Sequence, residues 1–255
     1  MTQRDLHEAG HPATPPPRLR DLARHNSAEV RARVAGNVST PAETLVKLAR
    51  DVDRMVRVMV AGNPQTPEYI LASLAADTDR AVREMVGDNR NSSMEVLTRL
   101  GRDKNTQVSR QALINVHMPA AELATYAQAN HWQVRYHVAL NPNMPSEVLL
   151  LLAQDRDARV RSPVAQNTRA TEDILRSLFR DQMAQVRARV AEHPKTPLEV
   201  LEMLEQDPEP VVRQATQWVA RHLEDDEAVL ADHSRFDWEL EPRDGGPSDR
   251  ISLGY

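Results

Sequence analysis

The sequence contains no cysteine and few glycine or aromatic residues, and each shortage excludes a class of protein. Without cysteine, the 255 residues can form no disulfide, thiolate metal site, iron–sulfur cluster or cysteine nucleophile. Only 8 glycines and 4% aromatic residues leave little material for β-turns and for large, rigid core side chains. The composition therefore favours helices that pack through leucine, valine and alanine.

The chain also lacks a long hydrophobic run and a strong overall charge. It opens with MTQRD, without the apolar stretch of a signal peptide, and its longest leucine-rich run, residues 148–152, is far too short to cross a bilayer. We therefore expect a cytoplasmic protein without membrane contact. Arginine outnumbers lysine 29 to 3, a bias that favours a GC-rich bacterial source.

The formal charge of −5 is unevenly distributed. Residues 223–255 hold ten acidic residues and three arginines, a net −7, which leaves the other residues near neutral at +2. This balance gives no global attraction for nucleic acid, so only a local stripe of positive charge could bind it.

The chain repeats itself every 26 residues. A valine recurs at this interval without insertion or deletion, at Val30, Val56, Val82, Val108, Val134, Val160, Val186 and Val212. A leucine follows the same period, at Leu19, Leu45, Leu71, Leu97, Leu123, Leu149, Leu175 and Leu201. A second leucine ladder is interrupted only by Tyr126, which we expect to be a core residue. Such self-similarity predicts stacked units, eight of them over residues 15–222.

The unit at residues 41–66 opens with a short helix. Thr40 as N-cap, Pro41 at the first helical position and Glu43 three residues after the cap predict a capping box. This helix is expected to run to Arg50, with its leucines on one buried face.

A second short helix completes the unit. Asp53 is predicted to cap it, and it should end at Gly62-Asn63-Pro64, where proline forbids continuation. Neither helix is long enough to be stable alone in water, so the unit gains stability only by stacking on its neighbours.

The phrase V-R-x-x-V-A-x-N-P-x-T-P, followed by leucines and an aspartate, resembles the leucine-rich repeat variant family. It is carried here by Val56-Arg57, Val60-Ala61, Asn63-Pro64, Thr66-Pro67, Leu71, Leu74-Ala75 and Asp77. The resemblance covers roughly four-fifths of the chain. It implies an all-α, right-handed α-solenoid of eight 26-residue two-helix repeats, one helix of each pair often with 3₁₀ character. The cysteine-ligated iron–sulfur module of some relatives is excluded here.

Two further segments flank the predicted solenoid. Residues 1–14 are expected to form a frayed cap, and residues 223–255 an acidic, disordered tail. The tail contains the acidic string DWELEP at 237–242, and Phe236 directly before it, together with Trp238 and Leu240, is typical of a short docking peptide. This peptide could bind another protein or fold back onto the arginine-bearing surface of the solenoid.

Three polar ladders accompany the apolar ones. Arginine recurs once per unit and fails only at Ser109: Arg31, Arg57, Arg83, Arg135, Arg161, Arg187 and Arg213. The same period carries an asparagine ladder and an aspartate ladder. One interpretation is a row of phosphate-binding guanidiniums. The other, which we favour, is structural: each arginine pairs with its own or a neighbouring aspartate, and each asparagine ties down a helix turn.

The sequence contains no recognisable catalytic motif. The repeated Asp-x-Asp, as at 51/53, lacks the glycine and glutamate of a calcium loop, and its second aspartate is more simply a helix N-cap. Motifs for zinc proteases, serine hydrolases and nucleotide-binding loops are absent. We therefore predict a protein that is not an enzyme and uses no cofactor or metal.

The repeat departs from its own pattern near its middle, at Ser93, Ser109, Ala112, Leu113 and Ala129. Trp132 and Tyr136 follow directly, at positions where other units tolerate any residue, which indicates exposure. They share a helix face, and such aromatics are enriched in binding hot spots. With Arg135 and His137 they form the predicted partner-binding site; the alternative is a local repacking over Ala112 and Ala129.

The leading function is thus a binding scaffold for protein–protein interaction. Nucleic-acid binding along the arginine ladder is the second candidate.

Overall fold

The computed structural model describes residues 2–217, which hold sixteen bounded helices and no strand. The predicted tail at 223–255 lies outside this range. The helices are α1 (Gln3–Gly10), α2 (Pro16–Leu22), α3 (Ala28–Gly36), α4 (Ala42–Leu48), α5 (Arg54–Gly62), α6 (Glu68–Leu74), α7 (Arg80–Asp88), α8 (Met94–Gly101), α9 (Thr106–Ile114), α10 (Ala120–Tyr126), α11 (Trp132–Ala139), α12 (Ser146–Leu152), α13 (Ala158–Gln166), α14 (Glu172–Leu178), α15 (Ala184–Glu192) and α16 (Leu198–Leu204). Residues 210–217 are again helical. None of the described helices has the length and hydrophobicity needed to span a bilayer.

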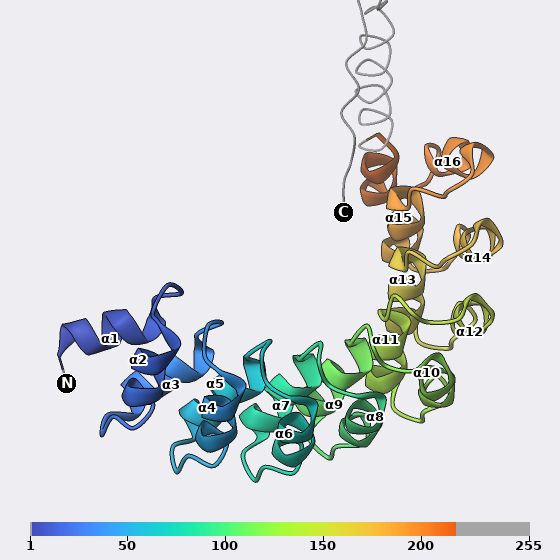
Figure 1. Cartoon of the computed structure of the whole chain (residues 1–255). Coiled ribbons are helices and arrows are strands. Elements are labelled where there is room, and N and C mark those ends of the chain that lie inside the picture. The colour runs from blue at the N-terminus through green and yellow to red at the C-terminus, as the bar shows by residue number, and fades with distance from the viewer. Residues whose placement is uncertain (1, 218–255) are drawn as a thin grey trace, which may run out of the picture.

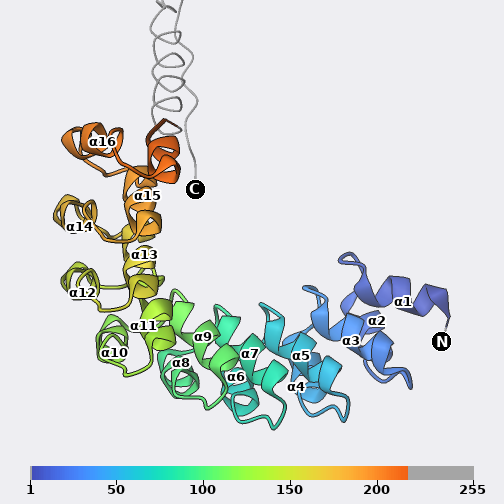
Figure 2. The same ribbon diagram turned by 180° about the vertical axis from the view of Figure 1, so that it is seen from behind.

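The helices form an α-solenoid (Figure 1). The odd-numbered helices stack on one another and line the inner side of the curve, while the even-numbered helices lie outside (Figures 1 and 2). Each even helix packs on the odd helix that follows it, so the predicted two-helix unit is the pair α4/α5 and its equivalents. The expected all-α solenoid is confirmed.

The apolar ladders form one continuous core. Val56 and Val60 on an inner helix and Leu71 on an outer helix are all 0% exposed. Their equivalents in neighbouring units join the same cluster. Each such side chain stabilises the fold by about 1.5–3 kcal/mol relative to full exposure. The core is thus assembled layer by layer along the solenoid, as stacking of identical units requires.

The start of the outer helix differs from the predicted capping box. α4 begins at Ala42, after Pro41, and no side chain caps it. The hydroxyl of Thr40 instead donates to the carbonyl of Val34, 2.5 Å away, in the last turn of the preceding inner helix. The prediction was wrong because this buried hydroxyl satisfies a helix C-terminus. The predicted N-cap of the inner helix is confirmed, since Asp53 accepts a hydrogen bond of 2.8 Å from the Met55 N–H.

The 3₁₀ character implied by the family resemblance is confined to helix ends. The Thr44 N–H donates to the Pro41 carbonyl (2.9 Å) at the start of α4, and the Arg50 N–H donates to the Lys47 carbonyl (3.2 Å) beyond its end. Such i→i+3 bonds satisfy terminal groups that an α-helix leaves unpaired.

The amino-terminal segment is an ordered helix, not the frayed cap that the sequence suggested. A capping box between Thr2 and Asp5 closes the start of α1, and Ala9 is fully buried against α3. The Asn37 side chain donates to the Ala9 carbonyl (3.0 Å). α1 therefore occupies the place of an inner helix and covers the first full repeat.

Candidate partner-binding groove

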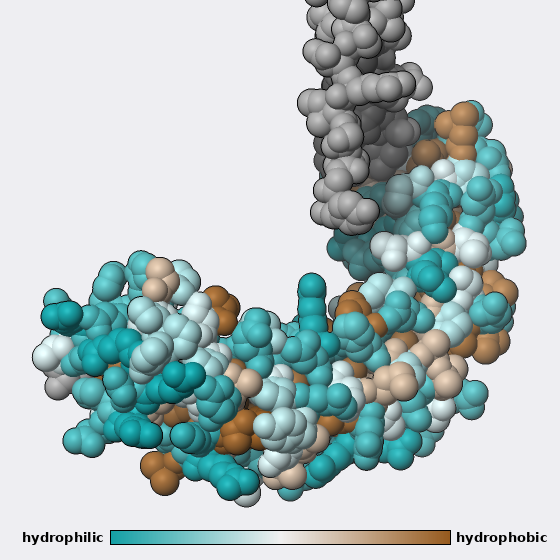
Figure 3. Space-filling model, in the orientation of Figure 1, coloured by the Kyte–Doolittle hydropathy of each residue, from teal (hydrophilic) through white to brown (hydrophobic). Residues whose placement is uncertain are grey.

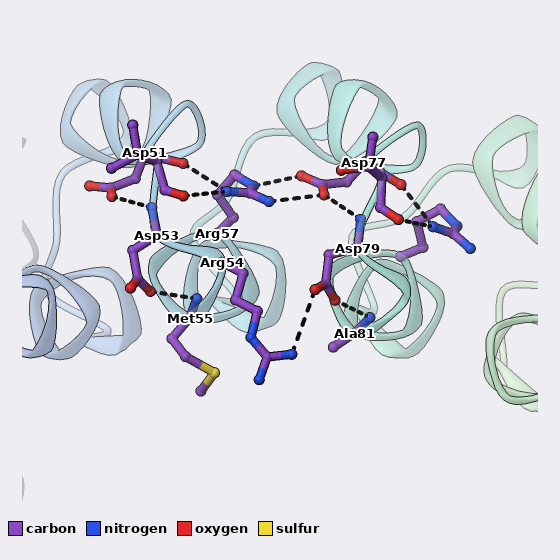
Figure 4. A network of polar contacts seen from close by, with 11 residues as sticks. Asp51, Asp53, Arg54, Met55, Arg57, Asp77, Asp79 and Ala81 are labelled. Atoms are coloured by element: carbon purple, nitrogen blue, oxygen red, sulfur yellow. Dashed lines mark hydrogen bonds and ion pairs between the residues drawn. The ribbon is translucent and has the colours of Figure 1, made fainter.

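Arginines of the ladder join neighbouring units, as Arg57 does in Figure 4. Arg57 donates from Nε to Asp77 Oδ2 (2.7 Å) and from Nη2 to Asp77 Oδ1 (3.1 Å), 20 residues further along the chain. Its Nη1 donates to the main-chain carbonyl of Asp51 (2.8 Å). We call this arrangement the clamp. Residues 2–217 contain six clamps: Arg31–Asp51, Arg57–Asp77, Arg83–Asp103, Arg135–Asp155, Arg161–Asp181 and Arg187–Asp207.

The clamp carboxylates are held in the ionised state. The Arg31 guanidinium is the main cause of the lowered pKa of Asp51. At Asp77 burial acts to raise the pKa, but hydrogen bonds from Arg57 and the Asp79 N–H outweigh it and leave the pKa lowered. Bidentate, charge-assisted bonds of this kind are among the stronger polar contacts in proteins.

These contacts confirm the structural interpretation of the ladder. Seven guanidiniums were also predicted as a phosphate-binding row. Six of them are directed at carboxylates of the chain itself, and Arg213 donates to the Asp207 carbonyl (2.6 Å). A phosphate would have to displace such partners. The phosphate-binding alternative thus stays a prediction, and this geometry does not favour it.

The asparagine ladder also crosses between units. Asn63 donates from Nδ2 to the carbonyls of Ala35 (2.7 Å) and Asn37 (2.9 Å) in the preceding unit, and its Oδ1 accepts from the Gln65 N–H (2.8 Å). Within the described residues, no buried side-chain nitrogen or oxygen is left without a partner. The inner helices are therefore fixed to one another by polar contacts as well as by packing.

The junction between α9 and α11 lacks its clamp. Ser109 and Ala129 stand at the arginine and aspartate positions, so these two helices are joined without the ion pair. Leu113, 0% exposed, also replaces the alanine or glycine that six other units have at its register position, which places a larger side chain between the two helices. The row of inner helices changes direction at this point (Figures 1 and 2).

The predicted aromatic pair lies just after this bend. Trp132 is the first residue of α11 and Tyr136 lies one turn later, with ring centroids 6.2 Å apart in an edge-to-face arrangement. The guanidinium of Arg159, from α13, stacks 3.7 Å from the centre of the Trp132 ring. Both aromatic side chains are half-buried, because each also packs against the core, whereas the sequence suggested free exposure.

These residues line a groove formed by three inner helices. The groove has a volume of about 510 Å³ and runs between α11, α13 and the start of α15. We call it the aromatic groove; its walls include Trp132, Tyr136, His137, Arg159, Met183 and Val186. A hollow of about 620 Å³ occupies the equivalent place between α3 and α5, but its walls hold no aromatic side chain: they are small residues, two methionines, Arg33, Asn37, Glu29 and Asp53. Of these two hollows, only the aromatic groove combines aromatic and cationic side chains.

The four residues of the predicted site do not all meet. Trp132, Tyr136 and His137 line the aromatic groove, whereas Arg135 is 7% exposed and clamped to Asp155 on another side of α11. Burial, with a smaller contribution from the charge of Arg110, lowers the pKa of His137. His137 is therefore neutral at pH 7, so the positive charge at the groove must come from arginines of other helices.

Sequence reasoning missed the residues that complete the groove. Arg159, Met183 and Val186 belong to the next two units, and only stacking brings them to Trp132. The repeat register was the signal that could have found them, because residues near the starts of successive inner helices come to lie next to one another when the units stack. The third predicted site, Phe236, Trp238 and Leu240, lies outside the described residues.

Figure 3 shows one face of the molecule, which is largely hydrophilic and carries isolated apolar patches. No continuous apolar strip is visible on this face.

Comparisons with known proteins agree with the repeat geometry. The family signature described as leucine rich repeat variant matches residues 132–157. A solved structure described as a leucine-rich repeat variant with a novel repetitive protein structural motif is 32% identical, over 79% of this chain and 80% of that chain, with a TM-score of 0.57. The Escherichia coli protein YibA is 16% identical over 87% of this chain and 98% of that chain, with a TM-score of 0.46. No curated protein matches the chain. From the repeat signature and the 32% identical structure, the chain belongs to the leucine-rich repeat variant family.

Proposed function

We propose that the chain is a non-catalytic scaffold that binds another protein, and that the aromatic groove is the centre of the contact. The observation that carries this proposal is the half-buried pair Trp132 and Tyr136 in an apolar groove of about 510 Å³. No other unit has an aromatic residue at either of these two positions.

The chemistry of the groove suits a protein ligand. Tryptophan and tyrosine offer large contact areas with little loss of side-chain entropy, and they dominate binding hot spots. Arg159 adds a cation beside the apolar floor, where it can meet a carboxylate. A ligand that combines apolar and acidic side chains fits both features.

The rigidity of the scaffold supports the same proposal. Clamps Arg135–Asp155 and Arg161–Asp181 fix α11, α13 and α15, the three helices that form the groove. A preformed groove loses less conformational entropy on binding than a flexible one. The groove walls are therefore already positioned before a ligand arrives.

Selection from a library of random peptides tests this proposal. The full chain, a Trp132→Ala/Tyr136→Ala variant and a Tyr69→Ala control are used as targets. Tyr69 is 64% exposed on the outer helix α6, so its loss should leave binding unchanged. Loss of a hot-spot pair should weaken the selected peptides by about 2 kcal/mol or more, roughly 30-fold. Peptides that bind the double variant as tightly as the natural chain would refute the groove as the binding centre.

The same assay distinguishes the nucleic-acid alternative. Oligonucleotides replace the peptides, and affinity is measured at several salt concentrations. Phosphate contacts lose roughly one log unit of affinity per log unit of salt for each phosphate neutralised. Tight, salt-sensitive oligonucleotide binding that survives Trp132→Ala/Tyr136→Ala would replace protein recognition by nucleic-acid recognition.

A further inference from the structure

The surroundings of the aromatic groove define the charge of its ligand. Arg159 and Arg189 are exposed on α13 and α15, and Arg110 is exposed on α9, close enough to His137 to affect its pKa. Arg159 and Arg189 have acidic partners on their own helices, at Asp157 and Glu192. Arg110 makes no ion pair or side-chain hydrogen bond within residues 2–217. One unpaired cation therefore lies beside the groove.

We propose that the aromatic groove is occupied by the chain's own segment 236–240, Phe-Asp-Trp-Glu-Leu, with the carboxylates of Asp237 and Glu239 near Arg110 and Arg159. This inference rests on the proposed function of the groove as a peptide-binding site. It names the ligand as a segment in which apolar and acidic residues alternate.

The pattern of the segment matches the groove. In an extended peptide, alternate side chains point to opposite sides, so Phe236, Trp238 and Leu240 share one side and the two carboxylates share the other. The apolar side can face Trp132 and Tyr136. The long side chains of the flanking arginines can reach the carboxylates from the rim of the groove.

Charge complementarity points the same way. Residues 223–255 carry a net −7 and the rest of the chain +2. The sequence suggested that the tail would meet the arginine ladder, but the clamps leave those guanidiniums bound to aspartates. Arg110 and Arg159, the exposed arginines beside the aromatic groove, are not held in clamps.

The length of the connection is sufficient. Residue 236 lies 19 positions after residue 217, and a chain of that length spans roughly 63 Å when extended. The helical residues 210–217 lie three inner-helix layers from α11, or about 30 Å at 9–10 Å per layer. The segment can therefore reach every part of the groove without unfolding the solenoid.

Occupation by this segment would make the groove self-inhibited. A partner has to displace the segment, so the apparent affinity of the full chain for the partner is lower than that of a chain with a weakened segment. Removal of the Trp238 side chain should then strengthen partner binding, whereas removal of Trp132 should weaken it.

The absence of cysteine permits a direct distance measurement on the full chain. Nitroxide labels are attached at Gln166→Cys, exposed at the end of α13, and at Ser234→Cys, two residues before the segment. Double electron–electron resonance should give a narrow distribution of short distances between these two labels. A second pair, Tyr69→Cys with Ser234→Cys, places the first label on the outer side and should give long distances.

Substitutions on both sides then test the contact. The short-distance component should become broad in each of three variants, Trp238→Ala, Tyr136→Ala and Arg110→Glu, while the circular dichroism spectrum stays unchanged. The proposal is overturned if the distribution of label-to-label distances is already broad without these substitutions, or if none of the three substitutions changes it. So does a short component that disappears on dilution with unlabelled protein, because the segment then binds a second copy. None of these results changes the outcome of the peptide selection described above. Failure of segment 236–240 to dock can therefore be distinguished from failure of the groove as a peptide-binding site.

Discussion

Ser109 and Ala129 stand at the two positions of a clamp, and both partners of that clamp are missing together. Asp103 is retained because its partner is Arg83 of the preceding unit, not the residue six positions after it. At the first junction an aspartate, Asp5, stands at the arginine position and a histidine, His25, at the aspartate position, with Nε2 of His25 4.0 Å from Oδ2 of Asp5. The two residues of a clamp position therefore change together from one junction to another. If only one of them were replaced, the other would be an unpaired charge with little access to solvent.

Restoring the missing clamp should stabilise the junction between α9 and α11. Ser109→Arg alone places an unpaired guanidinium at a position that is 8% exposed, and it should destabilise the fold. Adding Ala129→Asp should recover this loss, with a coupling energy of about 1–3 kcal/mol in a double-mutant cycle by urea unfolding. Additive effects of the two substitutions would mean that Leu113 holds the helices too far apart for the pair to form.

Removing one clamp residue should be costly. Arg57→Ala leaves the Asp77 carboxylate and the Asp51 carbonyl without their guanidinium, and should lower the free energy of unfolding by about 2–4 kcal/mol. Arg50→Ala is the matched control, because Arg50 is exposed and its side chain makes no contact of this kind; it should change stability by less than about 0.5 kcal/mol. Equal effects in thermal or urea unfolding would contradict a structural role for the ladder.

His193 should make stability depend on pH. Its ring replaces a ladder asparagine, lies 6% exposed, contacts the Asn167 carbonyl through Nε2 (3.1 Å), and accepts the Lys195 N–H at Nδ1 (3.1 Å). Burial is the main cause of its lowered pKa. The unfolded chain, with a histidine pKa near 6.5, therefore binds more protons than the folded one, and the free energy of unfolding falls as pH drops below about 6.5.

The variant His193→Asn isolates this contribution. An asparagine at this position can donate to two carbonyls as Asn167 does, and it does not titrate. The stability difference between the variant and the natural chain should therefore grow in favour of the variant between pH 8 and pH 5, as measured by urea unfolding at each pH. A constant difference would show that His193 is protonated equally in both states.

Much of the solenoid was predictable from particular residues. The ladders containing Val56 and Leu71 identified the buried positions, and Asp53 identified a helix start, because these roles depend on neighbours within a few residues. The role of Thr40 was misread because a cap and a hydrogen bond back to Val34 have the same sequence signature. The aromatic pair in the candidate groove was found by its departure from the repeat.

The sequence by itself determined the period, the helix pairs and the apolar faces, since each follows from short-range hydrogen bonding and burial within one unit. Tertiary structure alone decided that Arg57 pairs forward with Asp77, that Arg135 leaves the aromatic face, and that Arg159 stacks on Trp132. These contacts join residues about 20 or more positions apart. Their geometry depends on how one unit is rotated on the next, and local preferences do not fix that rotation.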